Sequence, residues 1–347
     1  MKARLIYNPT SGQELIKKSI ADILNELESY GYETSAFATT AEKDSARNEA
    51  ERASKADYDL IVAAGGDGTL NEVVNGMMTV YRSKRPKFAL IPAGTTNDFA
   101  RALKIPSNKP LEAIKIVGKK QTLGIDVGKK DDQTHFINIA AAGALTELTF
   151  SVPSQLKTTF GYLAYIQKGA ELLPRVKKHL VRITYDGNVI EEEISMFFCG
   201  LTNSVGGFEN IAPDAQINDG LFTLILVKTD NFFELIALLA IVASGSGNHV
   251  NDVNVTYLKA TNVKVEPLTD DKWMLNLDGE YGGEAPVEFV NLKGAIETFV
   301  NLDRVPDGKY IEEETLRDRE IEEMAKKFIE HAAAIKPESL NELNEEK

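Results

Sequence analysis

The feature that most constrains the fold is a regular alternation of apolar and helical segments in the first third of the chain. The expected strands are 2–7, 58–64 and 88–91, and the expected helices are 14–29, 41–56 and 70–82, with a further helix from residue 98. Strands that alternate with helices and are apolar throughout are typical of a parallel sheet covered on both faces. The sequence therefore predicts an α/β fold with an N-terminal doubly wound domain.

The pattern changes near residues 124–128. Beyond residue 180 the chain shows period-2 segments, a hairpin turn at Asp186-Gly187, and apolar runs at 196–201, 222–227, 263–265, 273–277 and 287–292. Helical patterns interrupt these runs only near 159–173 and 231–244. This arrangement indicates a β-rich, sandwich-like second domain.

Four segments follow from these patterns. We expect an α/β nucleotide-binding domain over residues 1–126 and a β-sandwich domain over 127–292. Residues 293–335 are expected to form a C-terminal return segment and a helix that pack on the N-terminal domain. Residues 336–347 include Pro337, are acidic beyond it, and are expected to form a flexible tail.

Composition excludes several classes of function. The formal net charge of -13 argues against a nucleic-acid-binding protein, which needs a basic surface to displace phosphate counterions. The single cysteine, Cys199, excludes a disulfide framework, and the four histidines show no i,i+4 pairing that would suggest a zinc site. No secretory signal or spanning segment is evident, so the expected location is the cytoplasm.

Three loops rich in Gly, Asn and Thr each follow an expected strand. They are Asn8-Pro9-Thr10-Ser11-Gly12, Gly65-Gly66-Asp67-Gly68-Thr69 and Pro92-Ala93-Gly94-Thr95-Thr96-Asn97-Asp98. The carboxyl ends of parallel strands meet at one sheet edge, so these loops should converge on one crevice. Backbone N–H groups, hydroxyls and helix N-termini suit a phosphate there, although a single loop of this kind is as often only a tight turn.

Asp67 is the informative residue of the second loop. An acidic side chain inside an anion-binding loop repels a triphosphate unless a cation or water lies between them. No Walker lysine signature is present to offset that repulsion. The sequence therefore predicts a nucleotide with Mg²⁺ bridged to the protein through water.

The sequences of these loops resemble those of a known family. Residues 65–72, Gly-Gly-Asp-Gly-Thr-Leu-Asn-Glu, resemble the signature of the diacylglycerol kinase catalytic domain, which sphingosine kinases and bacterial lipid kinases share. Residues 92–101 resemble the second signature of that family and residues 277–280 the third, and the likeness runs from Asn8 to about Val305. The chain looks most similar to the soluble diacylglycerol kinases of Gram-positive type.

The resemblance implies an activity. It implies ATP-dependent phosphorylation of the 3-hydroxyl of 1,2-diacylglycerol to phosphatidic acid, within phospholipid recycling. It also implies a Mg²⁺ cofactor, a homodimer, and a peripheral position on the inner face of the membrane beside anionic lipids. The alternatives are a kinase for another lipid alcohol such as sphingosine, an NAD kinase, which shares the Gly-Gly-Asp-Gly turn, and a non-catalytic nucleotide-binding regulator. The presence of both Asp278 and Glu280 disfavours the regulator.

The resemblance also implies residue roles. The positions that would bind the nucleotide are Asn8, Pro9, Thr10, Ser11, Gly12, Thr39, Gly66, Asp67, Gly68, Thr69, Leu70, Asn71, Glu72 and Thr95. Asp278 and Glu280 lie where the family has its catalytic base, and the choice between them is open. The alternative interpretation is that Asp278-Gly279 has no catalytic role and is only a hairpin turn.

Two magnesium sites are implied in the same way. Asp67, Asp98 and Asp126 would form a carboxylate network for the catalytic Mg²⁺, although Asp98 also suits a plain helix start and Asp126 a plain strand end. The carboxylate of Asp219 would bind a structural Mg²⁺ with the backbone carbonyls of Gln216 and Leu221, and the alternative there is a plain turn.

The sequence suggests one membrane-docking face. Its aromatic and apolar residues are Phe160, Tyr162, Leu163 and Tyr165, and its cations are Lys157, Lys168, Lys177 and Lys178. Packing of the aromatic side chains in an interdomain core is an equal alternative.

Overall fold

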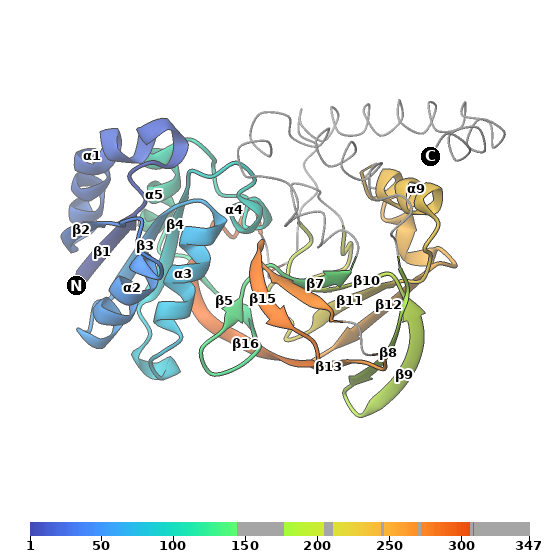
Figure 1. Ribbon diagram of the computed structural model, residues 1–347. Coiled ribbons are helices and arrows are strands. Elements are labelled where there is room, and N and C mark those ends of the chain that lie inside the picture. The colour runs from blue at the N-terminus through green and yellow to red at the C-terminus, as the bar shows by residue number, and fades with distance from the viewer. Residues whose placement is uncertain (144–176, 205–210, 244–245, 270–271, 306–307, 309–347) are drawn as a thin grey trace.

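The computed structural model describes residues 1–143, 177–204, 211–243, 246–269, 272–305 and 308 (Figure 1). Several predictions lie outside these residues. They are the helix near 159–173, the docking residues Lys157, Phe160, Tyr162, Leu163, Tyr165 and Lys168, and the C-terminal helix and tail beyond 308.

The first domain is a doubly wound α/β unit, as predicted. Its strands are β1 (Lys2–Tyr7), β2 (Glu33–Ala38), β3 (Leu60–Gly65) and β4 (Lys87–Pro92), which pair in parallel in the order β2-β1-β3-β4. Its helices are α1 (Leu15–Ser29), α2 (Ser45–Lys55), α3 (Asp67–Met77), α4 (Asp98–Ala102) and α5 (Pro110–Gly118), with 3-10 turns η1 (Ser11–Glu14) and η2 (Arg82–Lys84). Helix α1 packs beside α5, and α2 packs beside α3.

Three helices and one strand differ from the prediction. Strand β2 was not predicted, and helix α2 begins at Ser45 rather than at residue 41. Helix α3 begins at Asp67 rather than at residue 70, because Gly66 is its extended N-terminal cap and the loop turns directly into the helix. Helix α5 was not predicted. It begins with Pro110, whose fixed φ suits the first position of a helix.

The second domain has the predicted β-rich, sandwich-like form. Its strands are β5 (Thr122–Lys129), β6 (His135–Phe136), β7 (Ile139–Gly143), β8 (His179–Tyr185), β9 (Asn188–Ile194), β10 (Met196–Gly200), β11 (Phe222–Val227), β12 (Val255–Ala260), β13 (Asn262–Pro267), β14 (Met274–Leu277), β15 (Glu280–Glu284) and β16 (Val287–Phe299). Helix α9 (Phe232–Ala243) and the 3-10 turn η4 (Asn248–Asn251) complete the described elements. No helix among the described residues is long and apolar enough to cross a bilayer.

The second domain is built from two sheets with an apolar core. One sheet has the order β12-β11-β10-β7-β14-β15, and the other continues the parallel sheet as β4-β16-β13-β8-β9. The core contains Phe136, Phe197, Trp273 and Phe289, all almost fully buried. Cys199 is also buried there, which raises the pKa of its thiol and fits its expected role as a small core residue.

Strands β5 and β16 connect the two domains. They pair antiparallel, with an irregularity between Leu292 and Ile296. The expected domain boundaries at 126/127 and 292/293 fall within these two strands. The domains are therefore joined by hydrogen-bonded strands, which position the β14–β15 hairpin beside the loops of the first domain (Figure 1).

Candidate active site

The three predicted loops come together at one edge of the parallel sheet. Strand β1 lies between β2 and β3, so the order in which strands are added to the sheet reverses between β1 and β3, which is where open α/β sheets bind ligands. The N–H of Asn8 donates to the carbonyl of Ala64 at 2.9 Å, and that of Ala93 donates to Gly65 at 2.8 Å. Each loop is thus tied to its neighbour, so the three loops converge at one edge of the sheet.

Glycine is required where the second and third loops touch. A Cβ on Gly94 would lie 2.6 Å from the Cα of Gly66, and a Cβ on Gly66 would lie 3.3 Å from the Cα of Gly94. The side chain of Asn97 closes the third loop, because its Oδ1 accepts from the N–H of Gly94 at 2.7 Å and its Nδ2 donates to the Gly94 carbonyl at 2.9 Å. The loop backbones are therefore packed directly against each other.

Asp67 stands at the start of α3, facing the third loop. Its Oδ2 accepts hydrogen bonds of 2.9 Å from the hydroxyl of Thr96 and the N–H of Asn97. Its Oδ1 is buried and has no hydrogen-bond partner among the described residues. Burial, together with the carboxylates of Asp98 and Asp278, raises the pKa of Asp67 to about 6.

Asp98 links this cluster to the second domain. It is the first residue of α4, and its Oδ1 accepts a 3.2 Å hydrogen bond from the hydroxyl of Ser204, which follows β10. Carboxylates from α3, α4 and the β14–β15 hairpin thus act on one another electrostatically. A divalent cation would relieve that repulsion.

The remaining residues expected at the nucleotide lie on the three loops or at the end of β2. Asn8 folds the first loop, because its Oδ1 accepts from the N–H and the hydroxyl of Thr10 at 3.0 and 2.8 Å. Thr39 follows β2 and donates its N–H to the carbonyl of Tyr7 at 2.8 Å. Gly12 of the first loop has a φ of +58°, and its Cβ would lie 3.2 Å from the Cβ of Ala93. Pro9, Ser11 and Thr95 lie on these same loops, and Gly68 and Thr69 lie in the first turn of α3.

Two expected nucleotide residues have their side chains turned elsewhere. Leu70 is buried in the core of the first domain, so only its backbone is at the loop. The Oε2 of Glu72 accepts a 2.9 Å hydrogen bond from the N–H of Ala46 in the first turn of α2. Glu72 therefore caps a neighbouring helix.

Asp278 forms a dense set of hydrogen bonds. Its Oδ1 accepts from the N–H groups of Asn138 and Ile139, each at 2.9 Å. Its Oδ2 accepts from the N–H of Ile137 at 2.7 Å and from Nδ2 of Asn71 at 2.8 Å. Burial raises the pKa of Asp278, while these hydrogen bonds oppose the rise. Four donors leave this carboxylate little freedom to accept a proton from a substrate.

Glu280 lies two residues further on and is exposed at the first position of β15. The turn between them is the expected hairpin, with positive φ at Asp278 (+51°) and Gly279 (+96°), as a type I′ turn requires. A Cβ on Gly68 would lie 4.0 Å from Oε1 of Glu280. The carboxylate of Glu280 therefore lies next to the start of α3, where the Gly65–Thr69 loop is expected to bind phosphate.

Asp126 shares no hydrogen-bond partner with Asp67 or Asp98 among those described here. Its two oxygens accept from the N–H groups of Gly220 and Gly294 at 2.6 and 2.7 Å, and it is almost fully buried. Burial raises its pKa, and Asp219 adds to the rise. Asp126 thus joins the 216–221 turn to the irregular part of β16.

The expected structural ion site is partly occupied by protein groups. The Oδ1 of Asp219 accepts from the N–H of Leu221 at 2.8 Å, and its Oδ2 is 3.6 Å from the ammonium of Lys259. An ion bound by Asp219 with the carbonyls of Gln216 and Leu221 would compete with that ammonium. These residues therefore fit a bound cation less well than Asp67 does.

No three His, Cys, Asp or Glu side chains among the described residues converge closely enough to hold a metal by themselves. The unpartnered, buried Oδ1 of Asp67 and its raised pKa nevertheless fit a cation that takes its other ligands from phosphate and water. Mg²⁺ typically binds in this way, with one or two carboxylates and several waters.

Sequence reasoning missed several supporting residues. Thr96 and Asn97 hold Asp67, and they could have been found because they lie within the third loop. Ser204 has no signal in the sequence. Asn75 and His135 support Asn71. The Nδ2 of Asn75 donates to Oδ1 of Asn71 at 3.0 Å, and the N–H of His135 donates to Oδ1 of Asn75 at 2.8 Å. Burial lowers the pKa of His135 to about 4, so this core histidine is neutral.

Two family models match the chain. The model for the diacylglycerol kinase catalytic domain matches residues 2–130, and that for the YegS C-terminal NAD kinase beta sandwich-like domain matches residues 148–300. Together they cover the two domains seen in the fold. The class is therefore that of two-domain kinases built from an α/β domain and a β-sandwich.

Curated relatives specify the family. A diacylglycerol kinase of Bacillus subtilis is 50% identical over 291 residues, covering 84% of this chain and 93% of that protein. A diacylglycerol kinase of Staphylococcus haemolyticus is 46% identical over 321 residues, covering 92% of this chain and 94% of the relative. The chain belongs to the diacylglycerol kinase family.

Solved structures share the fold. A crystal structure from Bacillus anthracis strain Sterne superposes with a TM-score of 0.74 at 27% identity, covering 86% of this chain and 95% of the other. The crystal structure of a diacylglycerol kinase from the same strain gives a TM-score of 0.66 at 24% identity, covering 86% of this chain and 97% of the other.

Proposed function

We propose that this enzyme transfers the γ-phosphoryl group of ATP to the 3-hydroxyl of 1,2-diacylglycerol, giving phosphatidic acid for phospholipid recycling. The names of its relatives support this acceptor. The main support for the proposal is the position of Glu280. Its carboxylate is exposed and lies beside Gly68, next to the loop where the phosphates would bind. A base in that position faces both the nucleotide and an incoming alcohol.

The residues would divide the work as follows. Glu280 accepts the hydroxyl proton as the alcohol oxygen attacks the γ-phosphorus, the bond from that phosphorus to the β,γ-bridging oxygen breaks, and ADP leaves. Asp278 holds the hairpin that presents Glu280, and so acts as a positioning residue. The N–H groups at the start of α3 and the loops at Asn8 and Gly94 bind the phosphates. Catalysis is then largely positioning and charge neutralisation.

Asp67 would hold the catalytic Mg²⁺ through its unpartnered Oδ1, and the neighbouring Asp98 would act through the same cation or its water. Bound Mg²⁺ would neutralise the negative charge of the phosphates. Asp126, on β5, would hold the 216–221 turn through the N–H of Gly220, and Asp219 of that turn is the candidate ligand of a second, structural Mg²⁺.

Two alternative acceptors share this site chemistry. Another lipid alcohol such as sphingosine would need the same base and cation. NAD is favoured only by the description of the second family model, whereas the curated relatives cited above are named for diacylglycerol. A non-catalytic regulator would have no need of Glu280.

The test is ADP release from ATP in mixed micelles that contain dioleoylglycerol, sphingosine or no lipid, with NAD as a fourth arm. We expect release to depend on dioleoylglycerol and on Mg²⁺. Equal release with and without dioleoylglycerol would contradict the proposed acceptor, and release only with sphingosine or NAD would reassign it.

The proposal extends to the membrane and to assembly. A lipid acceptor requires the enzyme to reach a bilayer surface, which we propose is the cytoplasmic face with its anionic lipids. Lys177 is exposed, and Lys178 lies 3.5 Å from Asp230, so these are the described cations of the expected docking face. The homodimer implied by the family resemblance belongs to the same proposal, and sedimentation equilibrium measures it.

A further inference from the structure

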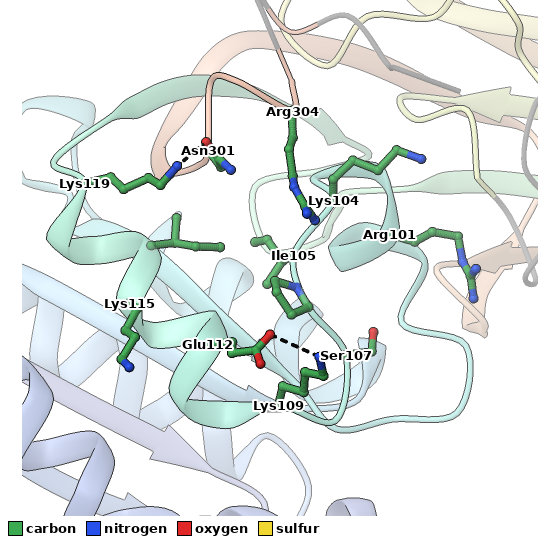
Figure 2. A pocket seen from close by; sticks show the side chains of 12 residues that line it. Arg101, Lys104, Ile105, Ser107, Lys109, Glu112, Lys115, Lys119, Asn301 and Arg304 are labelled. Carbon is green, nitrogen blue, oxygen red and sulfur yellow. Dashed lines mark hydrogen bonds and ion pairs between the residues drawn. The ribbon is translucent and has the colours of Figure 1, made fainter. Parts of the chain in front are cut away.

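A cavity of about 600 Å³ lies on the first domain, between α4, α5 and the segment that follows β16. Figure 2 shows the lining side chains, which come from α4, the loop between α4 and α5, α5 itself and the segment after β16. Its cationic lining residues are Arg101, Lys104, Lys109, Lys115, Lys119 and Arg304. Glu112 is the one acidic residue among the lining residues.

This charge is opposite to that of the molecule. The whole chain has a formal charge of -13, yet the cavity gathers six cations against one carboxylate. Glu112 pairs with Lys109 at 3.3 Å, and Lys119 lies 3.2 Å from Asp303 outside the cavity lining. Lys115 and Arg304 form no ion pair with any residue that the structure describes. The cavity therefore keeps a net positive charge after its internal pairs are counted.

The turn after α4 is held in a conformation unusual for its residues. The N–H of Ile105 donates to the carbonyl of Ala100, and that of Lys104 donates to Arg101, each at 2.9 Å. This is the helix-ending motif that normally has glycine at the position of Lys104, which has a φ of +51°. Lys104 therefore carries a side chain at a position that glycine usually occupies, and this side chain lines the cavity.

The cavity also has an apolar part. Ile105 and Ile116 are buried and Pro106 is partly exposed, and all three contribute to the lining. Cations above an apolar surface suit a phosphate that carries an organic group better than a bare inorganic ion.

Two hydrogen bonds in series connect the cavity to the candidate active site. The guanidinium of Arg101 donates to the carbonyl of Thr96 at 3.3 Å, and the hydroxyl of Thr96 donates to Asp67. A ligand at Arg101 is thus two contacts from the carboxylate expected to hold the cation.

We propose that this cavity is a second anion site, which binds a phosphate ester separately from the Gly66–Glu72 loop. The shared chemistry is a glycerol phosphate group, either on a soluble molecule or as the headgroup of an anionic phospholipid. This inference does not depend on the kinase reaction.

The test compares two double variants with the parent protein. Lys115→Glu with Arg304→Glu reverses two cavity cations that have no ion pair to lose. Lys55→Glu with Lys84→Glu makes the same charge change at exposed positions of the same domain, whose ion-pair partners lie outside the cavity. Circular dichroism melting verifies that both variants fold.

Calorimetric titration with sn-glycerol 3-phosphate and cosedimentation with phosphatidylcholine vesicles, with and without phosphatidylglycerol, separate the two sources. We expect at least about tenfold weaker binding for the cavity variant and parent-like binding for the control variant. Binding of glycerol phosphate assigns a soluble ligand, and binding only to phosphatidylglycerol vesicles assigns a lipid headgroup. Equal binding by the two variants, or no binding of either probe by the parent, overturns the proposal.

Discussion

The Nδ2 of Asn71 donates a 2.8 Å hydrogen bond to Oδ2 of Asp278, although the two residues are 207 positions apart in the chain. Asn71 belongs to α3 of the first domain, and Asp278 begins the β14–β15 turn of the second. Three backbone N–H groups at residues 137–139 complete the set of donors to Asp278. This contact holds the hairpin against α3, and Glu280 reaches Gly68 as a result.

Glu280→Gln should remove nearly all turnover without unfolding the protein. The amide cannot accept the hydroxyl proton, and a lost base typically costs about 10² to 10⁴ in kcat. The KM for ATP and the melting temperature should stay near those of the parent. Glu284→Gln on the same strand is the matched control, and steady-state kinetics that find equal kcat in both variants would exclude Glu280 as the base.

Asp278→Asn should lower both turnover and stability. An amide in place of the carboxylate would turn an NH₂ toward N–H donors, and lost hydrogen bonds to a charged group cost at least about 2 kcal/mol in total. Urea unfolding measures this loss. A variant that is inactive yet as stable as the parent would instead make Asp278 a catalytic base.

Asp67→Asn should stabilise the metal-free protein above about pH 6 and have little effect near pH 4. The folded-state pKa of about 6 exceeds the ordinary value of 3.8, so the folded protein binds more protons between these values. Its free energy of unfolding therefore falls as the pH rises through this window, by about 3 kcal/mol. Asparagine lacks this titration.

Chemical denaturation in EDTA across this pH range measures the effect. With Mg²⁺ and ATP analogue present, the order should reverse, because only the carboxylate can hold the cation. If the free energy of unfolding depended on pH in the same way in the variant and in the parent, Asp67 would not be the source of this pH dependence.

Gly94→Ala should destabilise the loops and weaken nucleotide binding. The added Cβ would lie 2.6 Å from the Cα of Gly66, and such overpacking costs about 1–3 kcal/mol. Gly31→Ala is the control, since that site has a φ of +86° but no atom within 4 Å. It should lose stability through backbone strain and keep its affinity for a fluorescent ATP analogue. Parent-like nucleotide affinity in Gly94→Ala would show that the loop contact is dispensable.

Asp219→Ala should abolish any Mg²⁺-dependent rise in melting temperature that comes from the second domain, because an ion bound only to the folded state stabilises it. Asp214→Ala is the control, since Asp214 also pairs with Lys259, at 3.3 Å. Melting curves in EDTA and in millimolar Mg²⁺ decide the matter. The same Mg²⁺-induced shift in all three proteins would leave Asp219 as a partner of Lys259 alone.

Much of the fold could be predicted because it depends on local patterns. Strand β11 (Phe222–Val227) coincides with the predicted run, and the turn at Asp186-Gly187 lies between β8 and β9 as expected. Helix α5 was missed because it is only nine residues long, and its Ala113, Ile114 and Val117 are buried by packing on α1 and β4.

The sequence alone determined the alternation of strands and helices, the order of the loops, and the residue types available for phosphate and cation. It could not choose between Asp278 and Glu280, because both are carboxylates on one hairpin. Only the tertiary structure separates them: one has four hydrogen-bond donors converging on it, and the other is exposed beside Gly68. The physical reason is that hydrogen-bond saturation and burial arise from segments far apart in the chain, which no local pattern encodes.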